Sequence, residues 1–214
     1  MPRGKLITIE GLDGAGKSTL ARALAETLHA RGLRVELLRE PGGVETSERI
    51  RTLVKDPALI VAPRAETLLY AAARAQLVEQ RLLPLLGEGT IVLLDRYVDS
   101  SLAYQGAARG LGIEQVREIN DFATGSLRAD RTLLLRIAPA AGRARQAARD
   151  ERPDRLELQD AEFYACIAAA YDELAAAEPD RIRVLDASFT PATVLADALT
   201  ALDDLLGERA SARG

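Results

Sequence analysis

A glycine-rich segment near the amino terminus has the residue types and spacing needed to hold a chain of phosphates. Residues 11–18 read GLDGAGKS and match the pattern G-x-x-x-x-G-K-[ST]. Glycines let the backbone turn so that its amides point at phosphate oxygens, Lys17 adds a positive charge, and the Ser18 hydroxyl can bind Mg²⁺. We therefore predict an ATP-binding segment of consecutive residues: Gly11, Leu12, Asp13, Gly14, Ala15, Gly16, Lys17, Ser18 and Thr19.

An acidic position further along the chain fits a metal ion beside those phosphates. The apolar run 91–94 ends in Asp95, and a carboxylate at the end of such a strand can reach Mg²⁺ directly or through water. Aspartate also ends many strands for structural reasons alone. The prediction that Asp95 is a metal ligand therefore depends on the presence of the glycine-rich segment. We predict that Ser18 and Asp95 hold Mg²⁺ as the cofactor, with ATP as co-substrate.

Short apolar runs alternate with longer helical patterns, and this alternation predicts how those residues are positioned. Strands are predicted over 6–9, 34–38, 91–94, 132–135 and 182–185. Helices are predicted over 17–31, 46–55, 64–86, 113–124, 139–149, 160–177 and 191–206. Strands that alternate with helices pair in parallel and are covered on both faces. We predict an α/β fold of three layers, a P-loop NTPase fold with a five-stranded parallel sheet flanked by helices and a small lid.

The composition restricts the class of protein. The chain has 214 residues, a net charge of −4 and one cysteine, Cys166. This length suits one sizeable core, the negative charge argues against general attraction to nucleic acid, and a single cysteine excludes an intrachain disulfide. No apolar run approaches the roughly 20 residues of a membrane helix, and the amino terminus lacks a signal peptide's apolar core. We predict one cytoplasmic domain over residues 1–206, a flexible tail over 207–214, and no nucleic-acid or membrane partner.

Four segments, in order, resemble the thymidylate kinase family. They read IEGLDGAGKST (9–19), REPGG (39–43), YAAAR (70–74) and DRYVDSSLAYQG (95–106), and the resemblance runs from Lys5 to about Leu205. It implies an ATP-dependent kinase that converts dTMP to dTDP for dTTP synthesis. It also implies a homodimer formed through the helices 64–86 and 113–124.

The resemblance implies roles at the sugar and phosphate of dTMP. Asp13 would approach the sugar 3′-hydroxyl, and the segment Glu40-Pro41 would line the acceptor site near the metal ion. Arg51 and Arg96 would hold the monophosphate, because a planar guanidinium can bind phosphate oxygens with two hydrogen bonds. Arg96 is the stronger candidate of the two because it adjoins the predicted metal ligand.

The resemblance also implies a set of residues at the base. Tyr70 and Arg74 are four apart on a helical pattern, so they share a face; Tyr70 would stack on the thymine ring and Arg74 would face the base and phosphate. Ser101 and Gln105 are also four apart and would hydrogen-bond the thymine edge. Tyr104 would lie beneath the sugar and crowd a 2′-hydroxyl, which favours deoxyribose.

A mobile arginine-rich segment is predicted to complete the site. Some members of the family carry an arginine where this chain has Gly14, so the charge that stabilises the moving phosphoryl group must come from elsewhere. We predict a lid over about 143–157, in which Arg143 binds ATP and Arg149, with Arg152 or Arg155, supplies that charge. The alternative is a solvated loop with internal ion pairs. The residues predicted to act in catalysis are Asp13, Lys17, Arg96, Arg149 and Arg152.

Two other functions stay open on the sequence. The chain could phosphorylate another monophosphate or a different small acceptor, or it could be a switch protein that binds ATP without transferring phosphate. An intact Lys17-Ser18 pair and Asp95 argue against the switch protein. One departure has no account in the sequence: Arg136 stands where many relatives have an acid.

Overall fold

The computed structural model describes residues 3–148 and 153–210. Within them, five strands form one parallel sheet: β1 (Leu6–Gly11), β2 (Val35–Arg39), β3 (Ile91–Asp95), β4 (Arg131–Arg136) and β5 (Ile182–Asp186). The strand order is β2-β3-β1-β4-β5, and every pairing is parallel. The predicted five-stranded parallel sheet is therefore confirmed.

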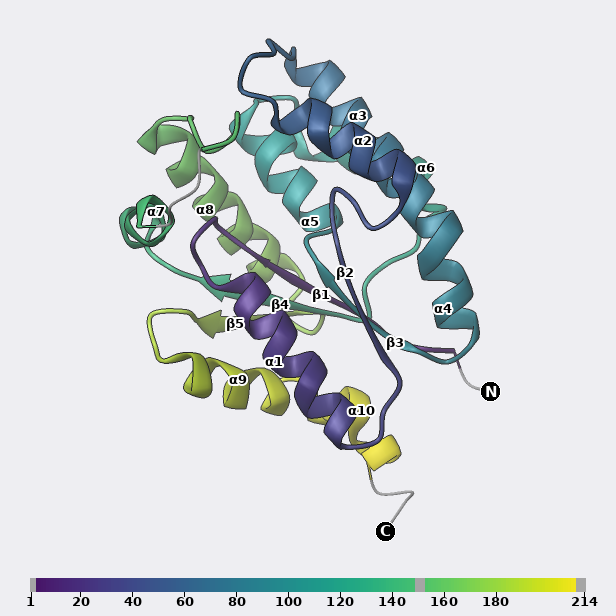
Figure 1. The fold of residues 1–214 in the computed structure, drawn as a ribbon. Helices are drawn as coiled ribbons and strands as arrows, with labels where there is room; N and C mark the ends of the chain where they lie inside the picture. The colour runs from purple at the N-terminus through teal and green to yellow at the C-terminus, as the bar shows by residue number, and fades with distance from the viewer. Residues whose placement is uncertain (1–2, 149–152, 211–214) are drawn as a thin grey trace.

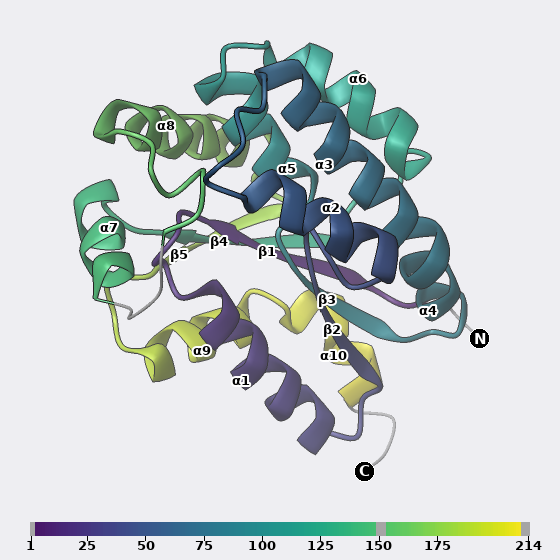
Figure 2. The same cartoon turned by 45° about the horizontal axis from the view of Figure 1, so that its top comes forward.

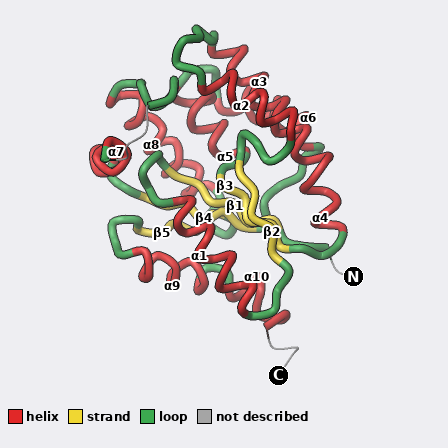
Figure 3. The backbone as a smooth tube through the Cα atoms, in the orientation of Figure 1, coloured by secondary structure: helices red, strands yellow, loops and turns green. Residues whose placement is uncertain are grey.

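Helices cover both faces of this sheet (Figures 1 and 2). On one face lie α1 (Lys17–Ala30), α9 (Pro191–Thr200) and α10 (Asp203–Ala210). On the other lie α3 (Pro63–Leu77), which continues through a π-helical turn (Val78–Leu82) into α4 (Leu83–Gly87), and then α6 (Ile113–Thr124) and α8 (Ala161–Ala177). The tube in Figure 3 shows the strands enclosed between these two helical layers. The predicted three-layer fold is confirmed.

The remaining helices surround one end of the sheet. α2 (Glu45–Lys55) packs on α3, and α7 (Pro139–Ala147) packs beside α8. α5 (Val98–Ser101) follows β3 and continues as a π-helix, η2 (Leu102–Ala108). Because all strands are parallel, their carboxyl ends meet at this end, where ligands of open α/β sheets bind.

The strands are largely apolar along their middles because both faces of the sheet are covered. Leu6, Ile7 and Ile9 of β1 are fully buried, as are Leu93 and Leu94 of β3. Such continuous apolar runs are typical of parallel strands between two helical layers.

No helix in the described part of the chain is long and apolar enough to cross a membrane.

Two helices differ from the predicted boundaries. The helix over 98–108 was not among the predicted helical segments, because Leu102, Ala103 and Gln105 are all buried and no polar face gives the segment a helical period. The helix predicted over 191–206 is interrupted by a turn at 201–202, where Leu202 enters the core. α10 then continues to Ala210, into the predicted tail; residues 211–214 lie outside the described part.

Candidate active site

The phosphate cradle lies between the end of β1 and the start of α1, and α7 rests against it. Gly14 has φ +79°, and a Cβ built there would lie 2.1 Å from the backbone oxygen of Gly142 in α7. A residue other than glycine would thus be strained and would also collide with α7. The cradle therefore has no room for an arginine at position 14.

Lys17 lies over the cradle backbone. Its ammonium group donates to the carbonyl oxygens of Gly11 (3.0 Å) and Leu12 (2.9 Å) and lies 3.9 Å from the Asp13 carboxylate. Burial, together with the nearby positive charge of Arg96, lowers the pKa of Lys17 to about 8. A cation in so desolvated a position binds an incoming anion more strongly than one in water.

Two oxygen donors at the cradle are suited to a hard divalent cation. The Ser18 hydroxyl donates to Asp95 Oδ2 over 2.7 Å, because β1 and β3 are neighbours and Ile9 pairs with Asp95. The described residues contain no group of three or more His, Cys, Asp or Glu side chains placed to hold a metal ion. A hydroxyl and a carboxylate fit Mg²⁺, which usually takes one or two protein oxygens and fills its other positions with water and phosphate.

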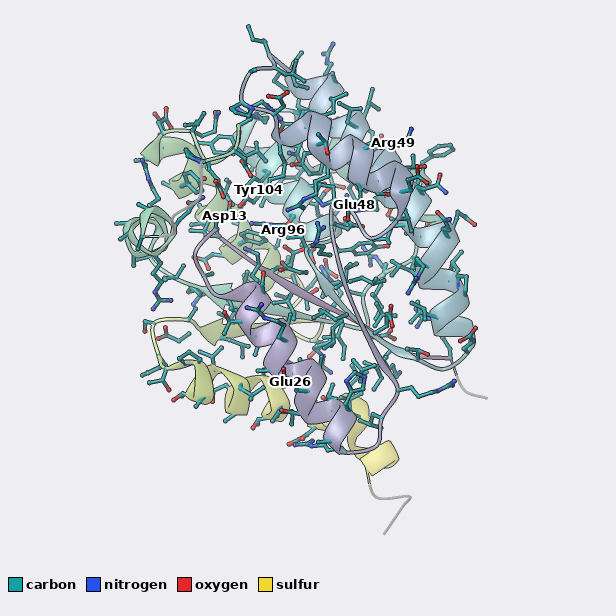
Figure 4. The ribbon with its side chains drawn as sticks, viewed as in Figure 1. Asp13, Glu26, Glu48, Arg49, Arg96 and Tyr104 are labelled. Carbon is teal, nitrogen blue, oxygen red and sulfur yellow. The ribbon has the colours of Figure 1, made fainter. Side chains whose placement is uncertain are left out.

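Asp13, Arg96 and Tyr104 form a polar cluster at the centre of the site (Figure 4). Arg96 NH2 donates to Asp13 Oδ1 over 2.6 Å and to the Tyr104 hydroxyl over 3.2 Å, and that hydroxyl donates to Asp13 Oδ2 over 3.2 Å. Burial opposes the charge on Asp13, but the positive charges of Arg96 and Lys17 outweigh it and hold the pKa of its carboxyl well below the usual range. Arg96 has φ +72°, so its backbone is strained to place the guanidinium here.

One cavity of about 490 Å³ extends from the cradle into the space between α2, α3 and the helix after β3. Of the described residues that line it, seven carry a positive charge and five a negative one, which suits an anionic ligand. The cavity brings together every residue predicted to bind the acceptor: Asp13, Glu40, Pro41, Arg51, Tyr70, Arg74, Arg96, Ser101, Tyr104 and Gln105. The predicted ATP and metal residues on its other side are Gly14, Gly16, Lys17, Ser18, Thr19 and Asp95.

Arg74 lines this cavity in a different way from the prediction. Arg74 as a whole is 2% exposed, and its guanidinium contacts Glu40 Oε2 (2.6 Å), Ser101 Oγ (2.8 Å), the Tyr97 carbonyl (2.9 Å) and Asn120 Oδ1. These contacts use the donors with which it was expected to meet the base and phosphate. Burial raises the pKa of Glu40, although the positive charge of Arg74 acts in the opposite direction.

Several lining residues were missed by the sequence analysis. Arg22, Arg39 and Lys55 add positive charge, and Ser100, Asp154, Leu156 and Glu157 complete the wall. Arg39 NH2 donates to Glu48 Oε1 over 3.0 Å, and Lys55 pairs with Asp154 at 2.8 Å. Arg39 is the last residue of β2, and this strand-end position was its available signal. Asp154, Leu156 and Glu157 fall within the segment predicted as a lid, whereas nothing local marks Arg22, Lys55 or Ser100.

Other predicted residues lie elsewhere or fall outside the described part. Arg143 is exposed on α7 and lies 5.8 Å from the centre of the Tyr164 ring. Arg149 and Arg152 lie outside the described residues. Arg155 is buried against Glu66, with 2.7 Å between NH2 and Oε2, and does not line the cavity.

The remaining cradle residues and Arg136 face smaller hollows. Gly11 and Leu12 line one of about 240 Å³ beside α8, and Ala15 lines one of about 310 Å³ beside α9. Arg136, for which the sequence had no account, pairs with Asp172 of α8 at 2.8 Å.

Comparison with known proteins then identifies the family. A family model described as thymidylate kinase matches residues 9–198. The chain belongs to the thymidylate kinase family. It is 48% identical to a thymidylate kinase of Deinococcus radiodurans over 88% of this chain and 91% of that relative. It is 44% identical to a thymidylate kinase of Bacillus licheniformis over 96% of this chain and 98% of that relative. Membership in the thymidylate kinase family confirms the predicted family, fold and enzyme class.

Proposed function

We propose that this chain transfers the γ-phosphoryl group of ATP to dTMP and releases dTDP and ADP. The observation that carries the proposal is the single cavity that joins the phosphate cradle to the residues expected at the acceptor. Two phosphate-bearing ligands can meet there end to end, because the cationic lining offsets their mutual repulsion.

Ser18 and Asp95 are the residues that would hold Mg²⁺. When bound, the ion would supply positive charge that offsets the negative charge of the outer phosphates of ATP. Lys17 turns from the cradle carbonyls to those phosphates, which gives its charge a better partner than two neutral oxygens.

The acceptor phosphate itself is the nucleophile, so the protein needs no strong base. Arg51 and Arg96 hold that phosphate. Arg96 is oriented for this by Asp13, and Arg51 by a 2.9 Å hydrogen bond to the Pro41 carbonyl. Asp13 also keeps an ionised carboxyl with which to accept a hydrogen bond from the sugar.

The base end of dTMP would lie between α3 and the helix after β3. Tyr70 offers a ring for stacking, worth about 1 kcal/mol, and Ser101 and Gln105 face the base edge. Tyr104 would lie beneath the sugar; Arg96 fixes its ring by a hydrogen bond to its hydroxyl, and the ring centre lies 5.1 Å from the Arg96 guanidinium carbon.

The hollow on the other side of the cradle suits the base of ATP. It is lined by Ala15 of the cradle, Arg145 of α7, and Phe189 and Pro191 at the start of α9. Arg145 NH1 is fixed by a 2.9 Å hydrogen bond to the Ala187 carbonyl. A guanidinium plane with apolar neighbours fits a flat aromatic base.

The lid and the dimer remain part of this proposal. Arg149 and Arg152 would supply charge to the transferred phosphoryl group from the segment that follows α7. Phe122 of α6 is 92% exposed and Leu68 of α3 is 58% exposed, so adjacent helices present apolar side chains that a second copy could cover. We place the enzyme in the cytoplasm, with ATP and dTMP as its ligands and no nucleic-acid or membrane partner.

A coupled assay of ADP release tests the function directly. With Mg²⁺ and ATP, we expect dTMP to be preferred over dUMP, dCMP, dGMP and AMP. Preference for another monophosphate would overturn the substrate assignment. ATP hydrolysis that does not depend on any acceptor, without dTDP formation, would favour the switch protein.

A further inference from the structure

The helix that lines the acceptor cavity carries a buried carboxylate that the mechanism above does not use. Glu66, Tyr70 and Arg74 follow one another at intervals of four on α3 and therefore share one face. Tyr70 and Arg74 line the cavity, whereas Glu66 is 0% exposed behind it. A fully buried acid is costly unless it is paired, so its partners indicate what it does.

Two hydrogen bonds join this face of α3 to the helix after β3. Arg74 NH1 donates to Ser101 Oγ over 2.8 Å, and Gln105 Nε2 donates to Glu66 Oε1 over 2.8 Å. Tyr70 lies between these two contacts along α3. The two helices are thus fixed to each other on either side of the ring proposed to stack on the base.

The surroundings of Glu66 decide which way the Gln105 carboxamide points. Arg155 NH2 lies 2.7 Å from Glu66 Oε2, and Arg109 donates over 3.3 Å to each of the two oxygens. A carboxylate paired with two guanidinium groups accepts hydrogen bonds and has no hydrogen of its own to donate. It therefore requires the amino group of Gln105 on its own side and leaves the amide oxygen for the cavity. Among the described residues, nothing donates a hydrogen bond to that oxygen.

From this geometry we propose that Glu66 is the positioning residue for base selection and acts through Gln105. The inference rests on the proposed function and specifies the ligand of the same site. An amide oxygen accepts a hydrogen bond from the ring N3–H of thymine. Cytosine has a bare N3 at that position, whose lone pair would face the amide oxygen. The site therefore selects a deoxynucleoside monophosphate whose base carries a ring N–H.

The test compares dTMP with 5-methyl-dCMP, which keeps the methyl group, the sugar and the phosphate and changes only the hydrogen-bonding edge. Glu66→Gln introduces a side chain that donates as well as accepts, so the Gln105 amide is free to turn. We expect the ratio of kcat/KM for the two substrates to fall by about tenfold, the loss of one buried hydrogen bond. The fall should come mainly from a higher KM for dTMP, with kcat nearly unchanged.

A double-mutant comparison separates this role from a structural one. Gln105→Leu should lower the same ratio, and Glu66→Gln added to it should lower the ratio no further, because Glu66 acts through Gln105. Additive losses would overturn the inference. Glu26→Gln, an exposed Glu-to-Gln change on α1, is the matched control and should leave the ratio at its wild-type value.

The outcomes for the inference and for the function are distinguishable. A wild-type enzyme that does not prefer dTMP contradicts the proposed function. A wild-type preference for dTMP that Glu66→Gln leaves intact contradicts the inference alone. Thermal unfolding checks that each variant folds. Should Glu66→Gln not fold, Glu66→Asp replaces it in the test. Aspartate keeps a carboxylate but is one methylene shorter, so the carboxylate moves away from Gln105. An unchanged ratio of kcat/KM for the two substrates in that variant also contradicts the inference.

Discussion

The close approach of α7 to the phosphate cradle can be tested with one methyl group. A Cβ added at Gly142 would lie 2.8 Å from the backbone oxygen of Asp13. Carbon and oxygen atoms in contact need about 3.3 Å, so the two backbones must separate by about 0.5 Å. Alanine in a helix is favoured over glycine by about 0.5–1 kcal/mol, whereas overpacking costs about 1–3 kcal/mol. We expect Gly142→Ala to destabilise the protein by about 1 kcal/mol.

The same displacement should affect catalysis selectively. α7 carries Arg145 into the hollow proposed for the base of ATP. A misplacement of about 1 Å can cost on the order of 100-fold in rate, so half that distance should cost about tenfold. We expect kcat/KM for ATP to fall by about tenfold in Gly142→Ala. The KM for dTMP should change less than the KM for ATP, because Asp13 is the one residue of the proposed acceptor set that lies at this contact.

Gly87→Ala is the matched control for this substitution. Gly87 ends α4, and a Cβ built there meets no atom within 4 Å, so alanine should bring only the helical preference. Denaturant titration and steady-state kinetics of both variants measure the difference. If Gly142→Ala proves as stable as Gly87→Ala and its ATP kinetics match the wild type, the contact between α7 and the cradle is not as close as described.

Three further outcomes follow from single side chains. Burial raises the pKa of Glu10 to about 7, so between pH 4.5 and 7 the folded chain binds a proton that the unfolded chain has lost. The free energy of unfolding therefore falls as the pH rises through this range, by up to about 1.4 kcal/mol per pH unit. In denaturant titrations, Glu10→Gln should remove this dependence on pH, and Glu26→Gln should leave it in place. Phe122→Asp should yield folded monomers in sedimentation analysis, and a persisting dimer would exclude this face. Asp160 accepts from the Phe163 amide at the start of α8, so Asp160→Ala should cost about 1 kcal/mol in thermal unfolding.

The sequence was sufficient for the parts of the site that are local in the chain. The cradle is contiguous, and its glycines, Lys17 and Ser18 each have one physical reason to be there. Asp95 could be placed because parallel strands end at a common edge. The acceptor residues came from family resemblance, and the fold brings them into one cavity.

The parts that could not be predicted depend on partners distant in the chain. Gln105 and Glu66 are 39 residues apart, and Tyr171 donates to Glu10 across 161 residues. Local pattern carries no information on such pairs. Arg74 is a second case. Its position in the site was predicted, but its N–H groups donate to neighbours that no local pattern identifies.

The two glycines that touch between the cradle and α7 also restrict the routes by which this sequence can change. An arginine at position 14 would need α7 to retreat first, because even its Cβ would lie 2.1 Å from the Gly142 oxygen. A retreat of α7 on its own would weaken the present ATP site before any arginine could compensate. Each change is harmful without the other, so descent from this arrangement to one with a cradle arginine requires a coupled pair of substitutions.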